Sequence, residues 1–587
     1  MLTPRRQRAV PSPNVEAYHL PAPTGGLNTI SAGSAVPVTD CIQGTNLIAS
    51  EFGLRSRLGY QQWVSGLRGT GNNNVRTMMP FQGSDSTKNR LFAATSNGIY
   101  NVTTYGWNAW VGSTAYALSI TVLNGSDLYI CRTAGTSAAS GGPTGTGTGI
   151  VDGTCTWDYV STAYVVDFPD KSGDAGYGIS SVFVNSAGHF LIYCDETNGL
   201  YIYTETSSTW AKISFGVTVA WTPSTYYVVN DQVTNGGNVY IVTASVASQL
   251  SAASGGPTGT GTGIVDGDIT WNYVSAASST AIGLSLSDTR AGLTLSPTNL
   301  VYVTAFKQRL WFVERNTARA WYLGLNALYG TATSFQMGTR FRQGGALVGL
   351  WNWTLDGGAG LDDMLVAISQ GGDVAIYQGT DPTSASTFGL KGVWYAGAIP
   401  AGRRIANNYG GDILVLSKLG LLSLSTLIAA RGQITSSEYA TAKIANLFST
   451  YMLQCSTSLG WSIRIHPEDN ALIITVPLDG QGQPSIQLAM SFATKGWFEY
   501  RELPIFCADV FNGHLYFGTT DGKINVNQGY TDITTAIQWR MMTGFQNLGN
   551  ARMKQVQSIR PIILCEGGAA GYKAEARYRY DFTEIAS

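Results

Sequence analysis

Residues 189–203 read HFLIYCDETNGLYIY, and the pattern in this stretch decides the fold. Two short runs with alternating apolar side chains flank the Asn198-Gly199 pair. Alternation buries one face of a β-strand, and Asn-Gly tolerates the positive φ of a tight turn. The stretch therefore predicts a β-hairpin.

The same pattern recurs along the chain. The other copies are residues 89–102, 363–377, 412–425 and 513–527, with a sixth at 308–323 that lacks the turn glycine. Repeated hairpins are the units of propeller blades. We therefore predict an all-β fold, a β-propeller of about six blades. An antiparallel sandwich or a β-solenoid would give the same hairpins, so these alternatives stay open.

A second repeat is nearly identical in its two copies. Residues 137–160 and 251–274 differ only at Thr154/Asp268, Cys155/Ile269 and Asp158/Asn272. Trp110 aligns with Trp221 upstream of the two copies. We interpret residues 110–162 and 221–276 as two small β modules inserted into a propeller that spans residues 76–530. We expect residues 1–75, an N-terminal arm and base segment, to pack with a C-terminal β segment, residues 531–587, in one β-rich base domain.

The composition excludes several classes of function. The chain has 36 Lys and Arg against 37 Asp and Glu, so no strong attraction to DNA or anionic lipid is expected. Neither a long apolar run nor a signal sequence is visible, and we expect a soluble protein made in the cytoplasm. Seven scattered cysteines without a C-x-x-C pair, and only four histidines, predict no disulfide framework, no metal and no cofactor.

Motifs for catalysis are weak. The loop GGPTGTGTG lacks the Lys and Ser/Thr of a phosphate-binding loop, and neither G-x-S-x-G nor H-E-x-x-H occurs. Two carboxylate clusters are present, Asp167, Asp170 and Asp174, and Asp356, Asp362 and Asp363. A carboxylate pair in one cleft would serve a depolymerase. Because turns favour Asp, we interpret both clusters as solvated turn residues and predict that the protein is not an enzyme.

Residues 20–60, LPAPTGGLNTISAGSAVPVTDCIQGTNLIASEFGLRSRLGY, carry a family resemblance. Gly25-Gly26-Leu27-Asn28, residues 46–51 and Arg57-Leu58-Gly59 resemble the opening of nozzle, or tail tubular B, proteins of short-tailed bacteriophages. The resemblance implies a structural virion protein of the tail, assembled in the host cytoplasm. It also implies a hexameric nozzle ring below the adaptor and portal, with a channel for DNA ejection, transient contact with the exiting DNA, and a platform for tail fibres or spikes.

The N-terminus supplies the predicted docking residues. Arg5, Arg6 and Arg8 form a basic cluster that is either a solvated tail or an arm that orders against an acidic partner. Together with the resemblance, this predicts adaptor docking by Arg5, Arg6, Arg8, Gly25, Gly26, Leu27 and Asn28.

The inserted modules resemble small chitin-type carbohydrate-binding modules. The matching pattern includes Trp157, Tyr159, Trp271 and Tyr273, and these four residues are the predicted glycan or surface contacts. The intervening loop, however, has no aromatic residue for stacking on a sugar. The alternative function is therefore a carbohydrate-binding adhesin that contacts the host envelope, which requires Trp157 or Trp271 to be exposed to solvent.

Overall fold

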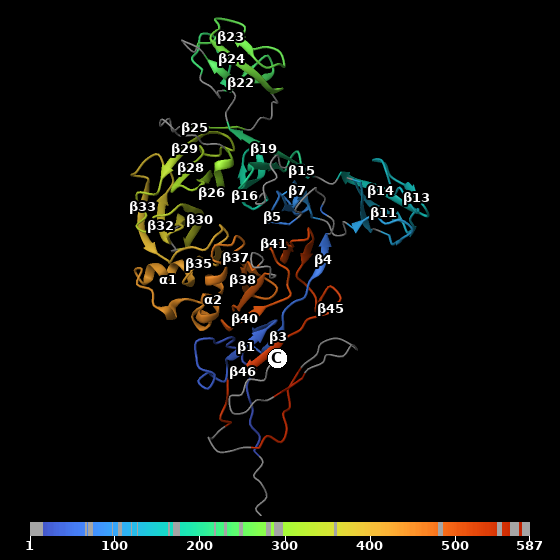
Figure 1. The fold of residues 1–587 in the computed structure, drawn as a ribbon, viewed down its shortest axis with the longest axis vertical. Helices are drawn as coiled ribbons and strands as arrows, with labels where there is room; N and C mark the ends of the chain where they lie inside the picture. The colour runs from blue at the N-terminus through green and yellow to red at the C-terminus, as the bar shows by residue number, and fades with distance from the viewer. Residues whose placement is uncertain are drawn as a thin grey trace, which may run out of the picture.

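The computed structural model describes residues 16–64, 67, 74–96, 98–103, 108–118, 120–125, 127–162, 165–167, 176–215, 219–227, 232–245, 250–276, 283–286, 297–356, 361–478, 485–548, 555–563 and 575–577. The fold is all-β, a β-propeller with inserted modules (Figure 1). The propeller fills the middle of the molecule, and the described segments that contain β1 and β46 lie below it.

Seven sheets of the described residues make up the propeller. They comprise, in chain order, β5(Thr77–Phe81), β6(Arg90–Ala94), β7(Gly98–Asn101) and β15(Val165–Asp167); β16(Gly178–Asn185), β17(Gly188–Asp195), β18(Gly199–Thr204) and β19(Thr209–Phe215); β26(Leu300–Phe306), β27(Arg309–Glu314), β28(Arg319–Tyr322) and β29(Gly330–Gln336); β30(Leu347–Asp356), β31(Leu361–Ser369), β32(Asp373–Gly379) and β33(Phe388–Tyr395); β34(Ala406–Tyr409), β35(Asp412–Ser417) and β36(Gly420–Ser423); β37(Ser462–His466), β38(Ala471–Val476), β39(Ile486–Ser491) and β40(Trp497–Tyr500); and β41(Cys507–Phe511), β42(His514–Gly518), β43(Ile524–Val526) and β4(Gln61–Val64).

The seven sheets contact one another in a closed order. β5 contacts β16, β16 contacts β26, β26 contacts β30, β30 contacts β35, β34 contacts β37, β37 contacts β41, and β41 returns to β5. This cyclic order is that of a propeller, in which each sheet packs its faces against its two neighbours. The propeller sheets in the described residues thus exceed by one the six hairpins recognised in the sequence.

The ring closes with a strand from the N-terminal side. β4 pairs antiparallel with β43, with Gln61 opposite Val526 and Gln62 opposite Asn525. The expected boundary at residue 75 placed residues 61–64 outside the propeller, and the structure differs. The three strands β41, β42 and β43 leave an open edge at β43, and pairing with β4 satisfies its backbone groups.

Both chain ends pack beside the sixth sheet. β1(Cys41–Thr45) pairs parallel with β40 and antiparallel with β46(Arg540–Thr543). The other elements of this base are β2(Leu47–Ser50), β3(Gly53–Ser56), β44(Thr531–Asp532) and β45(Thr535–Ala536). In Figure 1 these elements lie in the lower part of the molecule, where the blue and red ends of the chain meet.

Two short helices and four 3-10 turns accompany the strands in the described residues. These are α1(Leu424–Ala429), α2(Ala445–Cys455), η1(Ser86–Lys88), η2(Pro297–Asn299), η3(Ser436–Glu438) and η4(Ala442–Ile444). The three-stranded fifth sheet is followed directly by α1, whose Ser423 N-cap accepts a hydrogen bond from the Thr426 N–H. α1 packs on β35 and β36, and α2 buries Phe448, Tyr451 and Met452.

Two five-stranded sheets form the inserted modules. The first contains β8(Asn108–Ala109), β10(Thr121–Asn124), β11(Asp127–Thr133), β13(Ile150–Asp152) and β14(Cys155–Thr162), with β9(Ala115–Tyr116) and β12(Gly135–Thr136) beside it. The second contains β20(Val219–Ala220), β21(Gln232–Asn235), β22(Asn238–Ser245), β23(Ile264–Asp266) and β24(Ile269–Ala276). Both project from the propeller, the first at the side and the second at the top (Figure 1). β25(Gly283–Leu286) then runs between β19 and β29, joining two neighbouring sheets.

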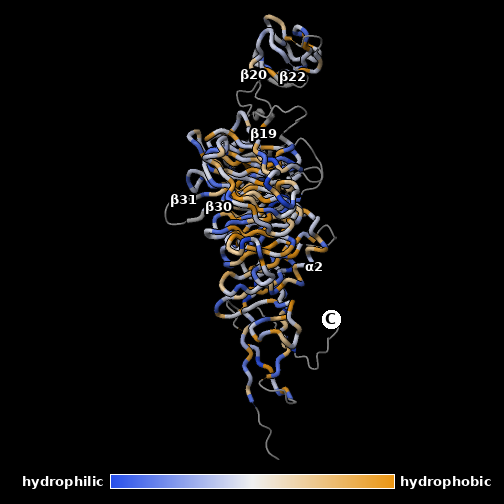
Figure 2. The backbone as a smooth tube through the Cα atoms, turned by 90° about the vertical axis from the view of Figure 1, so that its left-hand side faces the viewer, coloured by the Kyte–Doolittle hydropathy of each residue, from blue (hydrophilic) through white to orange (hydrophobic). Residues whose placement is uncertain are grey.

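The hydrophobic core follows the ring. Apolar residues concentrate between the sheets in the middle of the molecule (Figure 2). Trp311, Trp321, Trp461 and Trp497 are fully buried there. Burial of each large apolar side chain contributes about 1.5–3 kcal/mol, so these residues stabilise the ring.

Candidate functional sites

The predicted docking motif is built into the fold. Gly26 forms a parallel bridge with Trp497, the Leu27 N–H donates to the Trp497 carbonyl at 2.8 Å, and the Asn28 N–H donates to the Cys41 carbonyl at 2.8 Å. Leu27 and Asn28 are buried. The prediction that Gly26, Leu27 and Asn28 dock an adaptor is therefore wrong for this arrangement of the chain, because their surfaces are covered by β1 and β40.

A buried carboxylate explains the composition of this motif. Asp40 accepts a hydrogen bond from the Asn28 amide at 3.1 Å and an ion pair from Lys443 at 3.0 Å. A Cβ atom at Gly25 would lie 2.1 Å from the Asp40 carboxylate. Gly25, which is half-buried, thus admits the carboxylate instead of offering a contact surface. Arg5, Arg6 and Arg8 lie outside the described residues.

Arg57, from the Arg-Leu-Gly part of the same resemblance, joins the two ends of the chain. Its guanidinium donates to both oxygens of Asp532 at 2.8 and 2.7 Å, to the Asn46 side chain at 3.0 Å and to the Arg501 carbonyl at 3.1 Å. Its side chain is fully buried and that of Asp532 is 9% exposed. A bidentate pair of this kind fixes orientation, so Arg57 positions the C-terminal segment on the N-terminal one.

The predicted glycan contacts in the modules are core residues. Trp157 and Trp271 are both 0% exposed. The Trp157 indole N–H donates to Asp152 at 3.1 Å, and Trp110 donates to the same carboxylate oxygen at 2.7 Å. The interpretation of Trp157 and Trp271 as surface contacts is wrong, because each ring packs between the strands of its own module.

The second module repeats this arrangement. Trp271 and Trp221 donate to Asp266 at 3.1 and 2.7 Å, and the Ala252 N–H donates to its other oxygen at 3.1 Å. Tyr159 and Tyr273 are half-buried, in edge contact with Tyr129 and Tyr240. The two tyrosines therefore present part of each ring to solvent but belong mainly to the module core.

The glycine-rich loops are pinned to their modules. The Tyr129 hydroxyl donates to the Gly145 carbonyl at 3.0 Å, and the Asn124 amide donates to the Gly141 and Pro143 carbonyls at 2.8 and 3.0 Å. The copy at residues 255–263 has the same bonds from Tyr240 and Asn235. Several carbonyl groups of each loop thus accept hydrogen bonds from side chains of its own module.

Among the described residues, neither carboxylate cluster places two carboxylates in one cleft. Asp363 lines a hollow of about 540 Å³, and it is paired with Lys307 at 3.1 Å and accepts a hydrogen bond from Thr354 at 2.8 Å. It is the only carboxylate among the described residues that line this hollow. The side chains of Asp167, Asp170, Asp174, Asp356 and Asp362 lie outside the described part of the structure.

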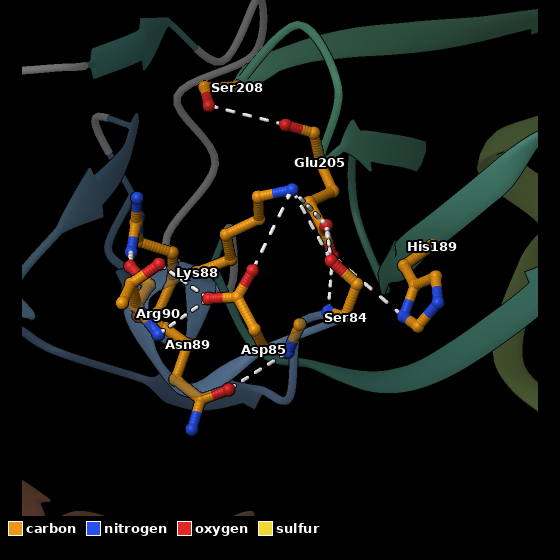
Figure 3. Close-up of polar contacts among 10 residues, drawn as sticks. Ser84, Asp85, Lys88, Asn89, Arg90, His189, Glu205 and Ser208 are labelled. Atoms are coloured by element: carbon orange, nitrogen blue, oxygen red, sulfur yellow. Dashed lines mark hydrogen bonds and ion pairs between the residues drawn. The ribbon is translucent and has the colours of Figure 1, made fainter.

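A polar cluster links the first two sheets (Figure 3). Glu205, after β18, accepts hydrogen bonds from the Ser84 hydroxyl and from the Ser84 N–H at 2.8 Å, and it pairs with Lys88 at 3.2 Å. His189 approaches the same carboxylate at 3.8 Å. Burial would raise the pKa of Glu205, but the Ser84 hydrogen bonds and the Lys88 ammonium hold it below its ordinary value.

Sequence reasoning missed an arginine that crosses the ring. Arg404 precedes the fifth sheet, yet its guanidinium donates to the Arg76 carbonyl, the Thr77 hydroxyl and the Gly178 carbonyl at 2.9, 2.6 and 2.9 Å. These acceptors belong to the first two sheets or the chain just before them. It also lies 4.5 Å above the centre of the Tyr177 ring. Arg404 therefore ties opposite parts of the ring together at its centre.

The neighbouring Arg403 acts in the same region. It pairs with Glu196 at 2.8 Å and donates to the Val348 carbonyl at 2.7 Å. Burial raises the pKa of Glu196, and the Arg403 charge opposes that shift. The adjacent pair Arg403-Arg404 was the available sequence signal, since buried arginines in a chain with 12% charged residues need partners.

The described residues hold no group of three or more His, Cys, Asp or Glu side chains arranged for a metal ion. In the part of the chain that is described, no helix combines the length and apolar character needed to cross a membrane.

No protein family model and no curated protein matches the sequence. Solved structures with a similar fold include the extracellular domain of a hybrid two component system of B. thetaiotaomicron, with 12% identity over 80% of this chain and 42% of that one, at a TM-score of 0.34. The chain thus spans less than half of that domain. The C-terminal WD40 domain of Sif2 is 11% identical over 80% of this chain and 99% of that one, at a TM-score of 0.33.

Proposed function

We propose that the chain is a structural subunit of the tail nozzle of a short-tailed bacteriophage. The observation that carries this proposal is the base: the segment that resembles nozzle proteins is held against the C-terminal segment by the buried Arg57–Asp532 pair. Such a base gives a closed propeller a fixed attachment region at one end. In this proposal six copies form the ring that receives the adaptor.

The path of DNA in this ring lies between copies. Arg404 spans the centre of the single propeller, with hydrogen bonds to Thr77 and Gly178 on other sheets. A DNA duplex needs the larger opening that several subunits enclose in a ring. The near balance of 36 basic and 37 acidic residues fits a channel that exiting DNA contacts only transiently.

The outward modules would then carry fibres or spikes. They leave the propeller between β7 and β15 and between β19 and β25, away from the base (Figure 1). The adhesin alternative loses its main support, because Trp157 and Trp271 are buried and unable to stack on a sugar. Tail fibre attachment requires only the exposed outer surface of each module.

Co-sedimentation with capsids tests this function. The purified chain is expected to sediment with tail-less capsids that carry an adaptor ring, and not with complete virions, in which the position is already filled. Unfolded chain serves as the control for nonspecific adsorption. Equal binding to both particles, or to neither, would contradict the proposal.

A further inference from the structure

The base exposes apolar residues that the propeller would bury. Residues 555–563, QVQSIRPII, are exposed at every position. Ile562 is 90% exposed, and Val556, Ile559 and Ile563 are between 39% and 47% exposed. The segment belongs to no described sheet or helix. A run of unburied isoleucines in a described segment is typical of a surface that a partner covers.

The base also has a sheet edge that is unpaired among the described residues. β46 is the last strand of the six-stranded sheet β37-β38-β39-β40-β1-β46 among the described residues. Trp539 and Met541, at this edge, are 42% and 39% exposed. An edge strand presents alternate N–H and C=O groups outward and accepts another strand readily.

The two features do not cover each other within one chain. If residues 555–563 covered β46 of the same chain, Ile562 and Met541 would both be buried. They are instead 90% and 39% exposed. Among the described residues, one chain therefore carries both an acceptor edge and a donor segment without a strand partner. Identical copies can satisfy both, because each copy offers the edge that the segment of another copy needs, and a head-to-tail arrangement of this kind forms a ring when its rotation closes.

We propose that residues 555–563 of one copy add as a strand to β46 of the next copy. The occupant of the edge is a second copy of this chain, and the inference rests on the nozzle ring proposed above. Added strands gain main-chain hydrogen bonds, and alternate side chains give specificity. Pro561 suits this role, because the added strand becomes the new edge, where a proline with no N–H is tolerated.

The assembly test compares two exposed positions. Ile562→Asp is expected to weaken self-association at least about tenfold, because a carboxylate would enter an apolar interface. The matched control is Leu453→Asp on α2, where the leucine is 88% exposed and should leave association unchanged. Sedimentation velocity over a concentration series measures both, and thermal melting checks that the two variants fold like the natural chain.

Cross-linking locates the contact. One chain carries Met541→Cys and another carries Ile562→Cys, both with Cys565→Ser, while the cysteines of the described residues are buried. A short bismaleimide should link the two chains only when they are mixed. Linkage within a single chain that carries both substitutions, at a concentration where it is monomeric, would overturn the proposal.

The outcomes separate this inference from the proposed function. Rings that form equally well with Ile562→Asp would overturn strand exchange and leave the nozzle ring standing. Rings that persist while adaptor binding is lost would identify the adaptor as the occupant and overturn the inference. A natural chain that stays monomeric at all concentrations, alone and with capsids, would contradict both.

Discussion

The propeller and the base of this molecule treat apolar residues differently. In the sixth sheet, β38 and β39 are buried at every position. In the base, Phe52 is 99% exposed, Ile562 is 90% exposed and Tyr530 is 74% exposed. The sheets of the propeller form a closed ring in which β4 supplies the fourth strand of the last sheet, whereas the six-stranded sheet of the base ends at β46 among the described residues. Packing between sheets therefore buries apolar side chains in the propeller, and the base leaves several of them exposed.

Breaking the ring closure should have the largest effect. Val64 in β4 is 1% exposed and belongs to the apolar cluster of the first and last sheets. Val64→Asp buries an unpaired carboxylate, and we expect a loss above about 4 kcal/mol, close to the whole stability of a typical domain. Gln61→Asp, on the exposed side of the same strand, should change stability by less than about 0.5 kcal/mol. Urea unfolding measures both. Similar losses at the two positions would show that β4 does not close the ring.

Breaking the Arg57–Asp532 ion pair in the base should reduce stability somewhat less. Arg57→Ala leaves Asp532 buried without its partner, and we expect a loss of about 3–5 kcal/mol in the stability of the base. The double variant with Asp532→Asn should recover part of that loss, because the stranded charge is gone. Denaturant unfolding of the natural chain, Arg57→Ala, Asp532→Asn and the double variant gives the coupling energy between the two side chains. Additive losses would mean that the pair is not coupled as the structure indicates.

The modules offer a matched pair of smaller changes. Asp152→Ala and Asp266→Ala each leave two indole N–H groups without their acceptor, and we expect about 1–3 kcal/mol of local destabilisation in each module. Protection of module amides in hydrogen exchange should fall while that of the propeller stays. Loss of protection throughout the propeller would show that the two carboxylates stabilise more than their own modules.

The smallest effect concerns the pH dependence of stability at the polar cluster of Glu205, Ser84 and Lys88, between the first two sheets. The pKa of Glu205 is below its ordinary value, so its stabilisation is present above the pKa of the unfolded chain and is lost as pH falls through the folded value. The Tm difference between the natural chain and Glu205→Gln should therefore shrink as pH is lowered from about 6 to about 3. A difference that stays constant over this range would assign the effect to packing instead.

The hairpin signal found most of the propeller and missed one sheet for a physical reason. Six sheets contain the recognised hairpins, but β38 and β39 of the remaining sheet are buried at every position, and ALIITV in β38 does not alternate between apolar and polar residues. A strand covered on both sides loses the period-2 alternation that marks a half-buried strand. β38 ends at Val476 and β39 begins at Ile486, a separation longer than that of a tight hairpin. A short continuous run of apolar residues therefore also indicates a strand, one that is buried on both faces.

The site residues were harder to predict than the fold. The resemblance of the modules predicts a glycan or surface contact at Trp157, but its ring is buried and its N–H donates to the buried Asp152. Gly25 was read as a docking residue, yet it makes room for Asp40. Arg404 drew no attention, because partners far along the chain decide its role. Local sequence carries residue type, whereas burial and long-range partners follow from the closed ring.

The most direct measurement of the central claim is negative-stain electron microscopy of the purified chain, alone and mixed with tail-less capsids. Our account predicts six-fold rings, or added density below the portal vertex, with the modules pointing outward. Dispersed monomers that ignore the capsids would contradict it.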